Sequence, residues 1–113
     1  MPATYDDAAL AVQLARWGTE LGLEDAGWAI FAEGFDPATS SLDDAPVRKL
    51  LSFGEVVATL VKQGVFDRGL ALDLWWVEGI WARLGPAAER ERDRLGDPRI
   101  FENIEALARS AGD

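Results

Sequence analysis

Carboxylates are the main candidates for chemistry in this sequence, which contains 20 Asp and Glu residues but neither His nor Cys. The two absences exclude disulfides, thiolate nucleophiles, imidazole acid–base catalysis and zinc sites of the usual ligand set. Two kinds of chemistry remain. A carboxyl group with a raised pKa could act as a general base, or several carboxylates together could bind a divalent cation.

Asp73 is the carboxylate that we expect to lie near the core, because it stands between Leu72 and Leu74 in a helical pattern. A carboxylate near a core usually has a hydrogen-bonding or ionic partner, and an arginine from elsewhere in the chain could serve. No second titratable group can be placed beside Asp73 from the sequence. A structural role is therefore favoured over that of a general base.

The other acidic pairs have the spacing of metal-binding carboxylates or lie in a loop: Glu20 with Glu24, Glu102 with Glu105, and Asp43 with Asp44. Carboxylate metal sites in helix bundles normally also contain His, and a calcium loop needs periodic oxygen ligands that are missing here. We interpret these pairs as solvated helix faces and turn residues, and we predict no catalytic residue, no metal and no cofactor. The enzyme alternative is a carboxylate-dependent, metal-binding hydrolase that combines Asp73 with acids of residues 1–46.

Tryptophan is the other conspicuous residue type, and Trp75, Trp76 and Trp81 stand close together. At 100° per residue an apolar stripe about 80° wide runs along one predicted helix, through Leu70, Leu74, Val77, Trp81 and Leu84. Trp81 lies within the stripe and is predicted to be core. Trp75 projects roughly 140° to one side and Trp76 roughly 120° to the other, so a second packing surface is required. Either another helix of this chain covers them, or they form with Ile80 a surface for a partner.

Arg99 is a further candidate for partner contact. It is predicted to lie one residue into the final helix, where the positive end of the helix dipole disfavours a cation. A positive charge at this place is explained if it pairs with Asp97 or with a carboxylate of a partner.

Charge is distributed unevenly along the chain. The net charge is −9, and residues 1–46 hold nine acidic groups against one basic, whereas residues 47–113 hold eleven against ten. This balance argues against nucleic-acid binding, which usually needs a basic patch. The acidic part could instead act as a decoy for nucleic acid and bind a basic protein surface. Because Met1–Leu10 lacks the pattern of a secretion signal and no apolar run reaches about 18 residues, we expect no membrane association and a cytoplasmic location.

Hydrophobic periodicity predicts an all-α fold. Helices are expected over residues 4–21, 24–34, 47–63 and 69–95, and from 97 onward, with a loop at 35–46. Thr4, Asp67 and Asp97 are the expected N-caps. Gly22, Gly64 and Gly96 are expected to end the helices that precede them. The stripe of the 69–95 helix continues past Pro86, which predicts one long helix kinked at that proline, with two separate helices as the alternative.

The predicted architecture is one domain, residues 1–113, built as a small bundle of four to six helices. Residues 1–46 supply acidic helices and a loop, and residues 47–113 supply the helical core. The helices at 47–63 and 69–95 are expected to form the central antiparallel pair, with the first and last helices packed across them.

Two segments carry a resemblance to a known family. LVKQGVFD (Leu60 to Asp67) and GDPRIFENIEAL (Gly96 to Leu107), together with Asp73, Leu74 and Trp75, resemble a bacterial family of short helical domains of unassigned function. The resemblance spans about residues 48–109 and leaves the acidic first part outside. It implies a helical fold and brings no catalytic residue.

The functional hypothesis is therefore a non-catalytic interaction or accessory module. Its contact surface is expected around Trp75, Trp76 and Ile80, and its partner is another protein or a second copy of the chain in a homodimer. The aromatic excess on more than one helix face and the scarcity of catalytic residue types favour this hypothesis over an enzyme.

Overall fold

The computed structural model describes residues 2–112, which form helices and no strand. The helices are α1 (Tyr5–Leu21), α2 (Leu23–Phe31), α3 (Ala45–Lys62), α4 (Arg68–Leu74), α5 (Val77–Leu95) and α6 (Glu102–Ser110). The all-α prediction is confirmed. Within the described residues, every helix is too short or too polar to span a lipid bilayer.

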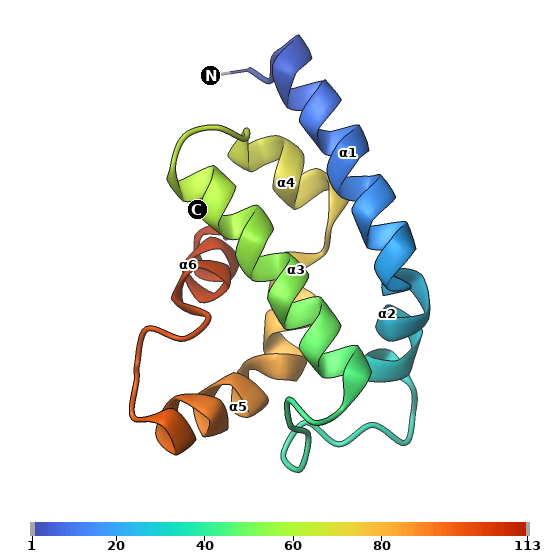
Figure 1. The fold of residues 1–113 in the computed structure, drawn as a ribbon, viewed down its shortest axis with the longest axis vertical. Coiled ribbons are helices and arrows are strands. Elements are labelled where there is room, and N and C mark those ends of the chain that lie inside the picture. The colour runs from blue at the N-terminus through green and yellow to red at the C-terminus, as the bar shows by residue number, and fades with distance from the viewer. Residues whose placement is uncertain (1, 113) are drawn as a thin grey trace.

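Helix α3 is the centre of the molecule. It packs against all five other helices, most extensively against α2 and α6, and Figure 1 shows it between α1 and α2 on one side and α6 on the other. The predicted central pair of residues 47–63 and 69–95 is therefore wrong. The contact between α3 and α5 is smaller than those of α3 with α2 and α6.

Several helix ends lie where the capping residues predicted them. Thr4 and Asp7 form a reciprocal capping box at the start of α1, with 2.8 Å from the Thr4 N–H to the Asp7 carboxylate. The Asp67 carboxylate accepts the Leu70 N–H at 2.8 Å and caps α4. Asp7 also accepts the backbone N–H of Asp67 at 2.9 Å, so one carboxylate ties the start of α1 to the start of α4. The glycine stops adopt positive φ, 77° at Gly22 and Gly64 and 66° at Gly96.

The predicted single helix over residues 69–95 is wrong, because the chain leaves the helix between Leu74 and Val77. Trp75 is extended, and Trp76 has φ −80° and ψ 69°. The Val77 N–H donates to the Trp75 carbonyl at 2.8 Å, which makes this an inverse γ-turn centred on Trp76. No proline or glycine stands at this turn. Tertiary packing decides the break, since it lets Trp75 turn inward while Trp76 reaches the end of α2.

Helix α5 continues through Pro86, as the stripe of apolar residues predicted, and the kink at that residue stays a prediction. The last helix begins later than expected. Residues 98–101 form a turn, Phe101 adopts a left-handed conformation with φ 57°, and α6 starts at Glu102. The physical reason is a cap from another helix: the Glu55 carboxylate of α3 accepts the Ile104 N–H at 2.8 Å and the Asn103 N–H at 3.4 Å.

The core consists of two clusters of buried apolar side chains. One fills the space among α2, α3, α5 and α6, around Leu51, Leu84 and Ile104, and the other lies among α1, α3 and α4 around Leu14, Val57 and Phe66. Trp75, Leu23 and Val61 pack against both clusters and join them. Trp81, predicted as core, is half-buried at the edge of the first cluster, and the Arg92 guanidinium lies 5.7 Å from its ring centroid.

Arginines of α5 hold the loops that surround it. The Arg83 Nε donates to the Ile30 carbonyl at the end of α2 at 2.9 Å, and Arg90 donates to the Ala38 carbonyl at 2.7 Å. Arg92 donates to the Ile100 carbonyl at 2.7 Å. Arg94 differs from these arginines, because its side chain is exposed and pairs with Glu91 of the same helix at 2.6 Å.

Candidate functional site

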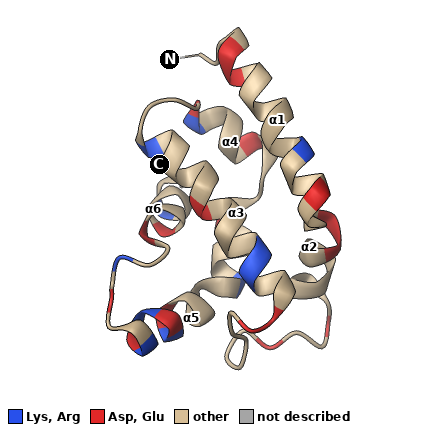
Figure 2. Cartoon of the chain, in the orientation of Figure 1, with Lys and Arg blue, Asp and Glu red and all other residues tan. Residues whose placement is uncertain are grey.

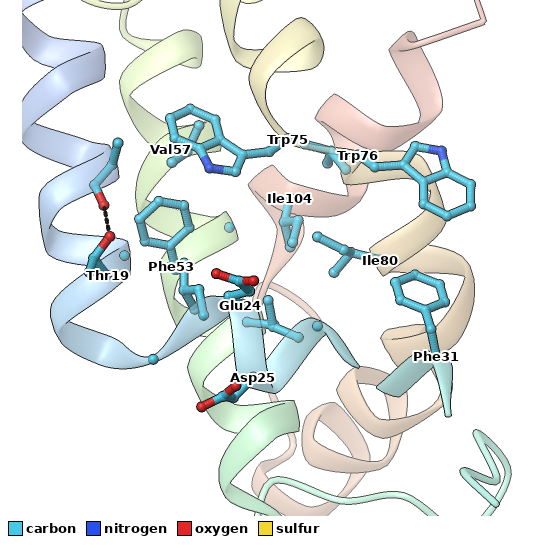
Figure 3. A pocket seen from close by; sticks show the side chains of 18 residues that line it. Thr19, Glu24, Asp25, Phe31, Phe53, Val57, Trp75, Trp76, Ile80 and Ile104 are labelled. Atoms are coloured by element: carbon cyan, nitrogen blue, oxygen red, sulfur yellow. Dashed lines mark hydrogen bonds between the residues drawn. The ribbon is translucent and has the colours of Figure 1, made fainter. Parts of the chain in front are cut away.

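A half-open apolar groove of about 500 Å³ lies among α1, α2, α3 and the turn between α4 and α5. We call it the aromatic groove; its principal walls are Phe31, Phe53, Trp75, Trp76, Ile80 and Ile104 (Figure 3). Its volume falls within the range of roughly 300–1,000 Å³ that ligand-binding clefts usually have. Three of the sequence-predicted contact residues, Trp75, Trp76 and Ile80, are therefore brought together in one site.

Trp75 forms the inner end of the groove. Its ring meets that of Phe53 edge to face, with centroids 5.4 Å apart, and lies 6.3 Å from the ring of Phe66. The side chain is half-buried, and Figure 3 shows its indole nitrogen on the side that faces the groove. The Trp75 N–H makes no hydrogen bond within residues 2–112. Since every fully buried polar side-chain atom in these residues has a partner, the Trp75 N–H must reach solvent. The groove thus has an apolar wall with an available donor.

Trp76 forms the outer rim and is 61% exposed. Its ring stacks on that of Phe31 with centroids 5.3 Å apart and planes 17° apart, which joins the start of α5 to the end of α2. The indole also lies over Gly79, where an added Cβ would come within 2.4 Å of the ring. Gly79 therefore leaves the space that the indole occupies, and the stacked pair presents a large apolar surface to solvent.

The glycines in the groove differ in what lies opposite them. An added Cβ at Gly54 of α3 would come within 2.3 Å of the Ile104 side chain, so Ile104 of α6 already fills that place. At Gly27, in the middle of α2, nothing lies within 4 Å of an added Cβ. Glycine inside a helix costs roughly 0.5–1 kcal/mol relative to alanine. No contact among the described residues explains why a glycine, with its cost to helix stability, stands at position 27.

Two carboxylates lie at the open edge of the groove, where α2 begins. Glu24 and Asp25 are exposed and line the groove, and neither forms an ion pair within residues 2–112. Figure 2 shows acidic residues running from the end of α1 into α2 without a Lys or Arg at this turn. The rim of the groove therefore carries negative charge that no ion pair among the described residues neutralises.

The two other predicted site residues lie away from the groove. Arg99 is exposed, and its Nε lies 3.4 Å from Glu102, while its backbone N–H donates to Asp97 at 2.9 Å. The prediction that Asp73 lies near the core is wrong. The residue is exposed, because α4 ends one residue later at Leu74 and leaves this side of the short helix in solvent.

The titratable groups with shifted pKa values lie outside the groove, and two of them, Glu55 and Glu105, lie at the contact of α6 with its neighbours. Partial burial raises the pKa of the Glu55 carboxyl above its usual value, although the N–H groups of Ile104 and Asn103 act in the opposite direction. Hydrogen bonds from Arg109 and Arg92 lower the pKa of the Glu105 carboxyl. In residues 2–112, no three acidic residues gather into a group that could hold a metal ion.

Sequence reasoning missed Phe31 and Gly27 as site residues. Both line the groove, and Phe31 is 40% exposed there. An isolated glycine inside a helical pattern was the available signal, but a glycine in close helix contact, such as Gly54, gives the same signal in the sequence.

A family model described as a domain of unknown function, DUF4760, matches residues 6–111, and the chain belongs to this family. The match confirms the predicted resemblance to a family of helical domains without assigned function. It also corrects its extent, because residues from Asp6 onward lie within the family and not only those from about Arg48. No curated protein and no solved structure matches the chain.

Proposed function

We propose that the protein is a non-catalytic interaction module that binds an apolar segment of a protein partner in the aromatic groove. The observation that carries the proposal is the stacked pair of Trp76 and Phe31, which are 61% and 40% exposed at the rim of an apolar groove. Exposed aromatic side chains beside a concave apolar surface are typical of sites where binding energy concentrates, because partners bury them at little cost in entropy.

The chemistry of the groove favours binding over catalysis. Its polar side chains are Thr19, Glu24 and Asp25, and the Thr19 hydroxyl donates to the Ala15 carbonyl of its own helix at 3.1 Å. The Thr19 hydroxyl is thus engaged within its own helix, and the described residues of the lining contain no imidazole, thiol or amine that could serve as a nucleophile or base. The charges at the rim are suited to orienting a partner.

Capture from the source organism tests the proposal, with one matched pair of variants. Trp76→Ala removes the rim of the groove, whereas Trp28→Ala removes a tryptophan that is 72% exposed and does not line it. Both are exposed positions, so both variants should fold. We expect the wild type and Trp28→Ala to retain the same proteins by quantitative mass spectrometry, and Trp76→Ala to lose them.

Two results would contradict this proposal. Retention of the same proteins by all three forms would show that the groove is not the contact site. Concentration-dependent dimerisation in light scattering that Trp76→Ala abolishes would replace the separate partner by a second copy of this chain.

A further inference from the structure

The backbone N–H and C=O groups of any segment that occupies the groove need hydrogen-bond partners where they meet its walls. These walls are helices and apolar side chains, and residues 2–112 contain no strand whose edge could pair with an extended segment. An extended peptide would therefore leave backbone N–H and C=O groups without partners against an apolar surface, which is costly. A helix satisfies these groups internally and presents only side chains, as in helix-in-groove recognition.

Gly27 lies on the wall formed by α2 and allows close approach. Since nothing within 4 Å meets an added Cβ there, the backbone of α2 is open toward the groove. Glycine is the residue that permits the backbone of another segment to come near. An occupying helix can thus lie closer to α2 than side chains at this position would allow.

The charge of the rim indicates the chemistry of the occupant. Glu24 and Asp25 form no ion pair among the described residues, and neither does Glu20 at the end of α1. Arg83 of α5 is engaged within the chain, because it donates to the Ile30 carbonyl and lies 5.8 Å from the Phe31 ring centroid. A second copy that docked by the same face would bring its own Glu24 and Asp25 against this rim, and the like charges would repel.

We propose that the groove binds an amphipathic α-helix of a protein partner, with apolar residues against Trp76 and Phe31 and a row of Lys or Arg along the edge that faces Glu24 and Asp25. This inference rests on the proposed function and specifies the partner segment. The apolar stripe of such a helix fills the groove, and its basic edge supplies the counter-charge that the rim lacks.

Two synthetic peptides test the inference by calorimetric titration against the full chain. Each is a Leu-rich amphipathic helix of about 18 residues, or five turns, and they differ only in having Lys or Glu along the polar edge. We expect the Lys peptide to bind and the Glu peptide not to bind. Affinity for the Lys peptide should fall as salt rises from about 0.05 M to about 0.5 M, because the Debye length shrinks.

Variants of the chain then locate the binding. Gly27→Leu places a side chain in the open groove and should abolish binding of the Lys peptide, while far-ultraviolet circular dichroism should show an unchanged helix content. Phe31→Ala is a second variant that keeps the test decisive if Gly27→Leu fails to fold. The double variant Glu24→Gln and Asp25→Asn should weaken binding about fivefold, as expected for exposed ion pairs, and Trp76→Ala should weaken it about thirtyfold.

Three outcomes would overturn the inference: equal binding of the Lys and Glu peptides, binding of the Lys peptide that Gly27→Leu and Phe31→Ala leave unchanged, or no binding of either peptide. The proposed function is judged separately by capture from the source organism. If capture depends on Trp76 but the Lys peptide does not bind, only the basic-helix chemistry fails. If capture does not depend on Trp76, the interaction site itself fails.

Discussion

Two helix-interior glycines line the aromatic groove, Gly54 of α3 and Gly27 of α2, and they differ in what lies beside them. Toward α6, the space beside Gly54 is filled by Ile104, and Glu55 caps the incoming helix. The space beside Gly27 is empty, and Phe31 and Trp76 are exposed above it. A contact within the chain thus explains the glycine at position 54, whereas none explains the glycine at position 27. The open space at Gly27 supports the proposal that a partner helix docks against α2.

The largest expected effect is on stability, at the contact between α3 and α6. Ile104 is 1% exposed, and Ile104→Ala should lower the free energy of unfolding by about 2–5 kcal/mol, because the truncation removes buried apolar surface and leaves a cavity. Chemical denaturation measures the change. Ile80→Ala, at a half-buried position on the groove, is the matched control and should cost clearly less. Equal losses would mean that the two positions are equally packed.

Alanine at the two glycines should change stability in opposite directions. Gly54→Ala forces a Cβ against Ile104 and should destabilise the fold by about 1–3 kcal/mol. Gly27→Ala meets nothing within 4 Å and should stabilise the fold by about 0.5–1 kcal/mol, because alanine favours the helix. Thermal denaturation of both variants measures the difference. A destabilising Gly27→Ala would show that α2 needs glycine for a reason inside the chain.

Because Glu55 caps α6, the stability of the contact between α3 and α6 should depend on pH. Because burial raises the pKa of Glu55 in the folded protein, the folded state holds this proton more tightly than the unfolded chain does. The wild type should therefore lose stability relative to Glu55→Gln as pH rises from about 4.5 through the folded pKa. Denaturant titrations of both proteins across this range measure the difference. A constant difference would contradict the raised pKa.

The contribution of Glu105 to stability should change with pH in the opposite direction to that of Glu55, and by a small amount. Arg109 and Arg92 lower the pKa of its carboxyl, so its contribution is present above the unfolded value of about 4.5 and is lost as pH falls through the folded pKa. The wild type should lose more stability than Glu105→Gln on acidification. The effect is small because the Arg109 side chain is largely exposed and solvent weakens the pair. Parallel curves for the two proteins would rule out this role.

Local signals predicted much of the fold. Thr4 and Asp67 capped the helices that they were expected to cap, and Gly22, Gly64 and Gly96 ended the segments before them. Such signals act within a few residues, so periodicity and capping chemistry suffice to read them. The break at Trp75 and Trp76 had no local signal, since neither proline nor glycine stands there.

The candidate site was predicted in part. Trp75, Trp76 and Ile80 do lie together, although for a different reason from the one expected, which placed both tryptophans on one continuous helix. Phe31 and Gly27 were missed because their role depends on which helix packs beside α2. Asp73 was misplaced because the end of α4 exposes it.

The sequence by itself determined the helical class, most helix ends, and an acidic chain without thiol or imidazole chemistry, because composition and short-range periodicity carry that information. Only the tertiary structure decided that the chain turns at Trp76, that Glu55 starts α6 in place of Asp97, and that one helix-interior glycine is filled while another stays open. These outcomes depend on contacts between residues far apart in the chain, where packing outweighs local preference.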